Sequence, residues 1–271
     1  MRKLVLLSII GLCAGAWVAG AADANLELNI LSAYVNYGQV GNDEAVFQPS
    51  FDVAGPYGFG FNLWANMDLT DNARSWWPNT AGEWSELNLE LNWTAPLEGP
   101  VSLTLGGVYF AYPQQASEVL IPEDSGEVIV QPHPADGGYE VYILVEAEDV
   151  LLSPRAQFYH DLGNADDWHA ELAIGHTIEL TAALSLDLTA ILGMAGKYYV
   201  EDNFGSDAGD AITHAQFEAT LNYALNEKIT LGLTGAFMTI LDSDIRDDVK
   251  ESDIYPDVDF FFGGLTIGYT F

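Results

Sequence analysis

Ionisable side chains that alternate with apolar ones are the feature of this sequence that is most suggestive of chemistry. In residues 84–93, Glu86 and Glu90 share one face of an extended chain with two asparagines, while leucines and a tryptophan occupy the other face. Only a two-residue period separates these sets cleanly, because a helix would scatter both around its axis. The same alternation predicts eight ionisable residues that line one interior: Glu86, Glu90, Glu140, Glu146, Arg155, Glu171, Asp187 and Glu218.

An interior of this composition would act on solutes electrostatically. Arg155 is the only base among the eight residues, so a dry interior would need protonated carboxyls or bound cations. A hydrated lumen lined with carboxylates favours cations instead. Two alternatives stay open beside it: a lumen filled by hydrogen-bonded polar side chains, and one blocked by an inward-folded loop at residues 113–138.

Two acidic segments are candidates for binding a hard cation. One contains Glu201, Asp202, Asp207 and Asp210, and the other contains Asp242, Asp244, Asp247 and Asp248, followed by Glu251 and Asp253. Calcium takes several oxygen ligands, which such loops could supply. Neither segment has the spaced acids, central Gly and terminal Glu of an EF-hand. Calcium at these external loops is therefore the one cofactor hypothesis, with Asp242, Asp244, Asp247 and Asp248 as the candidate ligands, and solvated, self-repelling loops are the alternative.

Signals for catalysis are missing from the sequence. The five histidines are dispersed, and neither HExxH nor GxSxG occurs. We therefore expect no enzymatic activity and no catalytic residues, with a membrane-embedded hydrolase as a remote alternative. The pair Trp76-Trp77 is expected to belong to an aromatic belt at a membrane interface, although exposed paired tryptophans could also bind a sugar or a partner.

The elements that would position these residues are short strands. From residue 25 onward the chain consists of alternating segments of about ten residues separated by turn residues, as in a membrane barrel. Counting them predicts an all-β fold: a transmembrane, antiparallel, up-and-down barrel of about 12 strands. Short connections alternate with longer, mostly acidic ones, as expected of turns on one side of a membrane and loops on the other. The last strand ends in Phe271, an aromatic suited to the interfacial girdle.

The first residues predict export. Arg2 and Lys3 precede an apolar stretch and then small residues, which is the order of a secretory signal peptide with cleavage between Ala21 and Ala24. Residues 1–24 are thus assigned to the leader and residues 25–271 to the barrel. Cys13, the single cysteine, lies in the leader, so the mature chain would have neither disulfides nor thiol chemistry.

The charge balance limits the partners. Eight Lys and Arg stand against 40 Asp and Glu, a formal net charge of −32. Nucleic acids are excluded, since binding to phosphates needs basic patches. Membrane lipid around the wall and small cations or neutral solutes are the expected partners. The sequence does not indicate an oligomeric state.

Several segments resemble a known family. They are Ser32–Val35, Gln48–Phe51, the Gly-Phe-Gly-Phe-Asn-Leu-Trp-Ala-Asn stretch at 58–66, and the later segments Glu140–Tyr142, Leu152–Pro154 and Gln157–Tyr159. On these segments the chain is similar to the Gram-negative outer-membrane barrels grouped as the Gcw_chp family of conserved hypothetical proteins. The resemblance implies the fold and the outer membrane of a Gram-negative-type bacterium, and it implies no substrate.

Together these patterns predict an outer-membrane β-barrel that is a narrow passive pore for small cationic or neutral solutes. The alternative is a closed barrel whose acidic external loops bind divalent cations or surface partners, in an adhesive or structural role.

Overall fold

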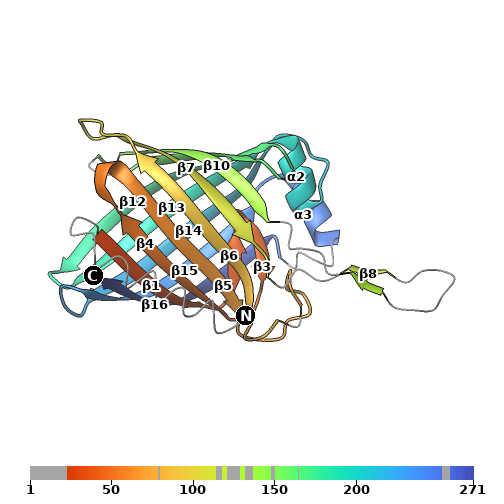
Figure 1. The fold of residues 1–271 in the computed structure, drawn as a ribbon, viewed down its shortest axis with the longest axis horizontal. Helices are drawn as coiled ribbons and strands as arrows, with labels where there is room; N and C mark the ends of the chain where they lie inside the picture. The colour runs from red at the N-terminus through yellow and green to blue at the C-terminus, as the bar shows by residue number, and fades with distance from the viewer. Residues whose placement is uncertain are drawn as a thin grey trace.

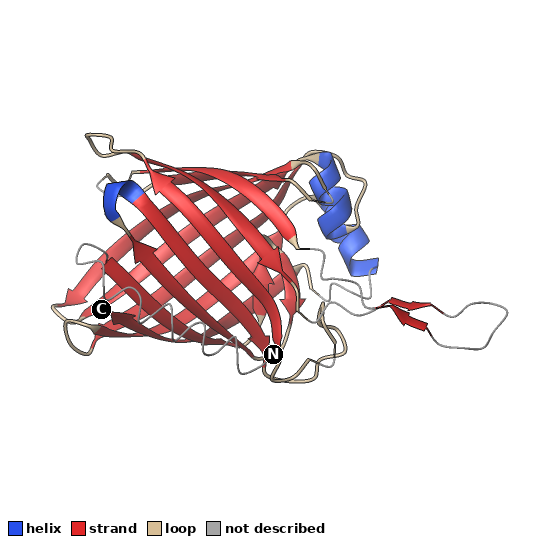
Figure 2. Ribbon diagram, viewed as in Figure 1, coloured by secondary structure: helices blue, strands red, loops and turns tan. Residues whose placement is uncertain are grey.

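The computed structural model describes residues 23–78, 80–113, 118–120, 129–131, 137–147, 150–163, 165–251 and 257–271. Twelve strands of this part form a closed antiparallel barrel (Figures 1 and 2). They are β1 (Asp23–Leu31), β4 (Val46–Ala54), β5 (Phe59–Asp68), β6 (Trp84–Thr94), β7 (Ser102–Ala111), β10 (Gly138–Glu146), β11 (Arg155–Asp161), β12 (Trp168–Thr181), β13 (Leu184–Ala195), β14 (Ala211–Ala224), β15 (Ile229–Ile240) and β16 (Asp259–Thr270). The prediction of about twelve strands is confirmed.

Each wall strand pairs with its neighbours along the chain, and β16 closes the barrel against β1. The closing register places Leu26 opposite Tyr269 and Leu28 opposite Ile267. Closure leaves no strand edge unpaired, which a membrane demands because lipid offers no partner to a free N–H or C=O group. Among the described residues, no helix is long and apolar enough to cross a membrane.

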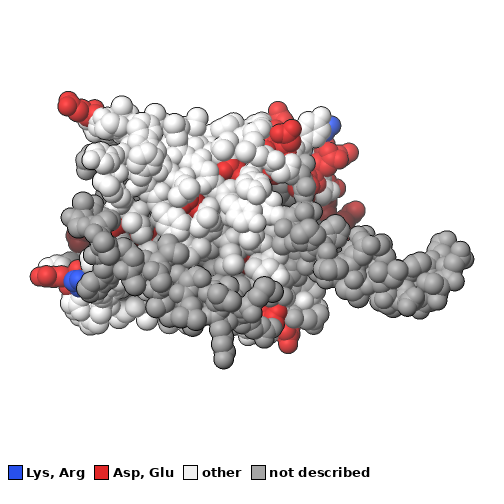
Figure 3. All heavy atoms as spheres, viewed as in Figure 1, with Lys and Arg blue, Asp and Glu red and all other residues white. Residues whose placement is uncertain are grey.

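The outer face of the wall is apolar. Leu89, Leu91, Val141 and Ile143 are exposed on it, each flanked in sequence by residues of the opposite face. Exposed acids and bases gather at the two ends of the barrel, and the wall between them is mostly free of charge (Figure 3). A soluble protein rarely exposes so continuous an apolar surface, whereas a lipid-facing band consists of one.

The connections differ strongly between the two ends. At one end, which we call the turn end, tight turns such as 182–183 and 225–228 join the strands, together with the short 3-10 helix η2 (Pro56–Gly58). At the other end, the loop end, longer segments carry α2 (Lys197–Phe204), α3 (Ser243–Glu251) and two small hairpins, β2 (Tyr34–Asn36) with β3 (Gln39–Asn42) and β8 (Glu118–Leu120) with β9 (Ile129–Gln131). The predicted sorting of connections by length is confirmed.

The β2–β3 hairpin lies inside the barrel at the loop end. Val40 of β3 belongs to a buried apolar cluster with Tyr199 and Val200 of α2, Ile245 of α3 and Met238 of β15. Met238 and Ile240 point inward from the loop end of β15, where the alternating pattern would place polar residues. This cluster anchors the hairpin in the lumen and fastens α2 and α3 over it.

The early part of the chain departs from the expected boundaries. The first wall strand is short: β1 ends at Leu31, and the chain then turns into the lumen. Residues 23 and 24, assigned above to the leader, pair with β4 in the wall. The rest of the predicted leader lies outside the described residues, so its cleavage stays a prediction.

Candidate functional site: the lumen and its outer constriction

Burial of the inward-facing side chains changes along the lumen. Toward the loop end, Asn66, Asp68 and Glu86 are buried, with Glu86 only 2% exposed. Farther toward the turn end, inward residues of the same and other strands, such as Glu90 and Thr177, are half-buried or exposed. The turn-end half of the lumen is therefore open to water, and the loop-end half is filled.

The structure places the eight predicted lumen residues on the polar inner face of the wall, where most have hydrogen-bond partners. Near the loop end, Glu86 accepts a hydrogen bond from Tyr34 (2.8 Å). Farther along the same strand toward the turn end, Glu90 accepts a hydrogen bond from Tyr142. Asp187 accepts from Thr177 and Asn222 (2.6 Å each), and Glu218 accepts from Gln216 (2.6 Å). Glu146 and Arg155 occupy paired positions of β10 and β11 at the turn end.

Two histidines that we did not count among the site residues pair with the remaining acids. His169 Nε2 lies 3.1 Å from Glu140 Oε1, and His214 Nε2 lies 3.3 Å from Glu171 Oε1. Both histidines are 3% exposed. Their sequence signal was available, because each falls on the same alternating face as its neighbouring glutamate. Arg155 is thus not the only interior group that can carry positive charge beside the acids.

The tip of the β2–β3 hairpin docks against these histidines. The Tyr37 ring packs edge-on against His169, with centroids 4.6 Å apart, and His169 stacks on Tyr159 and Tyr199. Gly38 follows with a φ of +81°, and a Cβ atom there would come within 2.6 Å of His214. Glycine is required at this position by both the backbone conformation and the close approach.

The sides of the hairpin are held by the loop at residues 69–83. The Trp76 backbone N–H donates to Gly41 O (2.8 Å), Asn72 Nδ2 donates to Asn42 Oδ1 (2.8 Å), and Arg74 forms an ion pair with Asp43. The loop is itself fixed through Asp68, which accepts hydrogen bonds from Ser75 and Thr80. The β2–β3 hairpin and the 69–83 loop, which together we call the constriction, thus form a small folded unit with its own hydrogen bonds.

The paired tryptophans belong to this unit. Trp76 and Trp77 both pack on the Tyr34 ring of the hairpin, with centroid distances of 5.7 and 6.2 Å, and Trp77 also stacks on Tyr112. The assignment of Trp76-Trp77 to an interfacial belt is therefore wrong. An alternating pattern cannot distinguish a tryptophan of the interfacial belt from one that packs on the hairpin, because the pair lies in a loop outside any strand.

The Tyr34–Glu86 hydrogen bond offers a test of the constriction. Burial and the neighbouring Glu86 carboxylate raise the pKa of Tyr34 well above its usual value, so the phenol stays a donor at any physiological pH. Tyr34→Phe would remove a donor from a buried carboxylate, at a cost of roughly 1–3 kcal/mol. We expect a lower melting temperature in detergent. Tyr142→Phe is the matched control, and its effect should be smaller because Glu90 is partly hydrated; equal effects would contradict the burial argument.

A polar cavity of about 250 Å³, which we call the outer chamber, lies beside the hairpin at the loop end. Its lining comes from β2, β3 and the residues between them, from the loop-end portions of β6, β7, β10 and β11, and from α2. The lining includes four acids: Glu86, Glu140, Asp161 and Asp202. Two of these acids, Glu86 and Glu140, are buried carboxylates of the lumen wall.

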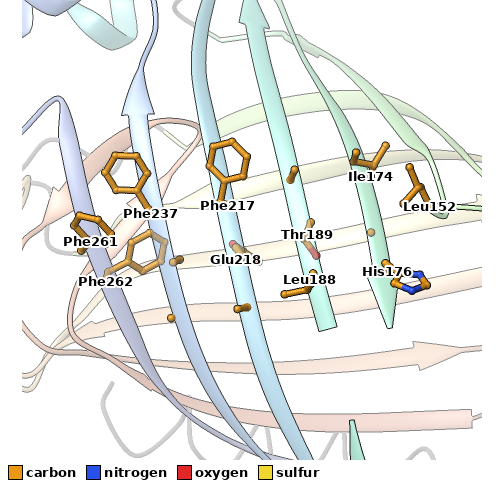
Figure 4. A pocket seen from close by; sticks show the side chains of 15 residues that line it. Leu152, Ile174, His176, Leu188, Thr189, Phe217, Glu218, Phe237, Phe261 and Phe262 are labelled. Atoms are coloured by element: carbon orange, nitrogen blue, oxygen red, sulfur yellow. The ribbon is translucent and has the colours of Figure 1, made fainter. Parts of the chain in front are cut away.

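A larger hollow, of about 740 Å³, lies on the outer wall over β12 to β16 (Figure 4). Its lining is mainly apolar, with the rings of Phe217, Phe237 and Phe261 on neighbouring strands. Phe217 and Phe261 are exposed and belong to the lipid-facing set of alternating residues. The groove therefore lies on the lipid-facing side of the wall.

The acidic segment proposed for calcium has a helical structure. Asp242 caps α3 by accepting the backbone N–H groups of Asp244 and Ile245, and Asp247 lies 3.6 Å from Lys250. Asp248 directly follows Asp247 in the same helix. Within the described ranges, no three His, Cys, Asp or Glu side chains are grouped closely enough to hold a metal ion. Calcium binding there stays a prediction.

No protein-family model matches the sequence, and no curated protein matches it. The resemblance to the Gcw_chp family therefore stays a prediction. Solved structures do match. The KdgM porin is similar with a TM-score of 0.50 at 8% identity, over 91% of this chain and 99% of that one. The NanC porin gives 0.49 at 10% identity over 91% and 98%, and an outer membrane channel from Pseudomonas putida F1 gives 0.48 at 10% over 93% and 96%.

At such identities the similarity concerns the fold alone. The closed twelve-strand wall, its apolar outer band and its polar interior define the class of protein: this chain is a transmembrane β-barrel of the outer-membrane type.

Proposed function

We propose that this barrel is a narrow passive channel that favours small cationic or neutral solutes. The observation that carries the proposal is the series of carboxylates on the inner face of the wall, from Glu86 and Glu140 at the constriction to Glu90, Asp187 and Glu218 in the hydrated half. Carboxylates in a confined, partly desolvated passage attract cations and repel anions. The names of the similar structures, which include porins, support a channel without indicating its solute.

The β2–β3 hairpin sets the width of the proposed passage. It fills the centre of the lumen at the loop end, so solutes would pass beside it through the outer chamber, which holds about 250 Å³. A passage of this size suits small ions and molecules, since pockets for drug-sized ligands are on the order of 300–1,000 Å³. The channel would therefore have a low conductance compared with an unobstructed barrel of the same strand number.

A planar-bilayer recording under a KCl gradient tests this function. We expect small, discrete conductance steps and a reversal potential whose sign shows preference for K⁺ over Cl⁻. The preference should weaken as the salt concentration rises, because mobile ions screen the carboxylates. A reversal potential of anion sign would contradict the proposal, and a complete lack of conductance from correctly folded protein would favour the closed barrel.

A further inference from the structure

The lining of the outer chamber is acidic and therefore favours a positively charged occupant. Among the described residues, its lining contains the acids Glu86, Glu140, Asp161 and Asp202, and no Lys, Arg or His. Burial and the nearby Asp161 raise the pKa of Asp202, because desolvation and a neighbouring carboxylate both disfavour its negative charge. A positively charged occupant would offset the mutual repulsion of these carboxylates.

One acid of the chamber has an unsatisfied oxygen. Glu140 is 8% exposed, and its Oε1 lies next to His169 Nε2 at 3.1 Å. Its other oxygen, Oε2, is buried and has no hydrogen-bond partner among the described residues. A buried carboxylate oxygen without a donor costs free energy and is rare in folded proteins. A donor supplied by a bound molecule would remove that cost.

The lining indicates an organic cation. Among the described residues, no three His, Cys, Asp or Glu side chains are grouped closely enough to hold a metal ion. The chamber lining also includes the aromatic side chains of Tyr34, Tyr37, Trp76 and Tyr199. Aromatic faces attract ammonium groups and also cover apolar carbon. An ammonium group offers three donors, which suits an acceptor such as Glu140 Oε2.

We propose that the outer chamber binds a small primary amine in its ammonium form. The ammonium group donates to the Glu140 carboxylate, and the apolar part of the amine lies against the tyrosine and tryptophan rings. This inference rests on the proposed function in that the chamber lies on the proposed solute path, and it narrows the solute class to primary amines of about ten non-hydrogen atoms or fewer, given the cavity volume.

Binding can be measured on the detergent-purified protein without any transport assay. We would titrate it with phenethylammonium chloride by calorimetry, and in parallel with 2-phenylethanol and phenylacetate, which have the same ring and a neutral or anionic head. We expect saturable binding of the amine and none of the other two. Equal binding of the amine and the alcohol would overturn the proposal, and so would displacement of the amine by an equal concentration of KCl.

Variants locate the site. Glu140→Gln should weaken amine binding by about tenfold or more, because a hydrogen bond to a charged group is lost. Asp202→Asn, on a helix outside the wall, should weaken it by about threefold without disturbing the barrel. Glu227→Gln, in an exposed turn at the opposite end, should leave the affinity unchanged. Unchanged affinity in both chamber variants would refute the site.

The channel function and the amine site can be refuted independently of each other. Amine binding to a barrel that conducts no ions would refute the channel and keep the chamber site. Conductance with cation preference in a barrel that does not bind the amine would keep the channel and refute the chamber site.

Discussion

Removal of the β2–β3 hairpin should raise the single-channel conductance by roughly threefold or more, because it opens the filled half of the lumen. The pairing of β1 with β4 shows how to remove it. Leu31 pairs with Val46, so Ser32 and Ala45 continue the same register, and residues 33–44 can be replaced by Asn-Gly. Asn-Gly is the preferred two-residue turn between antiparallel strands. The barrel wall keeps all its strand pairs in this variant.

A second deletion distinguishes the two ways of blocking the lumen. Replacing residues 118–131, which include β8 and β9, by a short Gly/Ser linker should leave the conductance unchanged, since this hairpin extends away from the barrel (Figure 1). If this variant conducts more and the 33–44 variant does not, then the 113–138 loop is the block, as the alternative from the sequence had it. Heat-modifiable migration in electrophoresis would verify that both variants are folded.

The triple variant Glu86→Gln, Glu90→Gln, Glu218→Gln should lose about half or more of the cation-sign reversal potential. Glutamine keeps the side-chain length and an acceptor oxygen, so the hydrogen bonds from Tyr34 and Tyr142 can persist. The variant thus removes charge from the constriction and from the hydrated half while it retains the packing. The reversal potential under a KCl gradient is the measurement.

The matched control removes the same charge elsewhere. Glu98, Glu227 and Glu251 are exposed, in two turns and at the end of α3, and none faces the lumen. Their combined change to Gln should leave the reversal potential within error of the unmodified protein. If both triple variants behaved alike, selectivity would arise from net charge and not from the lumen wall.

The wall and its inner lining were predictable because both follow from a local rule. Lipid on one side and water or polar groups on the other impose a two-residue period, and a single strand such as β6 displays it without reference to its neighbours. For this reason the positions of Glu86, Glu90 and Glu218 could be assigned before any neighbour was known. His169 and His214 follow the same alternation. They were not included among the lumen residues because they were considered only as candidate catalytic groups.

The packing of the β2–β3 hairpin inside the lumen could not be predicted from the two-residue alternation. Residues 32–45 carry no local sign of an inward position, because that position depends on side chains far away in the chain: Met238 on β15, Ile245 on α3 and Tyr199 on α2. Those inward-facing apolar residues break the alternation locally, and a broken pattern alone does not indicate what packs against it. The pairing of Glu140 with His169 likewise joins strands that do not follow one another.

By itself, then, the sequence determined a closed barrel with an apolar exterior and an acidic interior. The reason is that residues facing lipid and residues facing the lumen alternate along each strand. Only the tertiary structure decided that the first long connection folds into that interior, narrows it and encloses a chamber beside Glu140. The physical reason is that the hairpin is stabilised by the summed burial of groups from several distant strands and helices, which no single segment encodes.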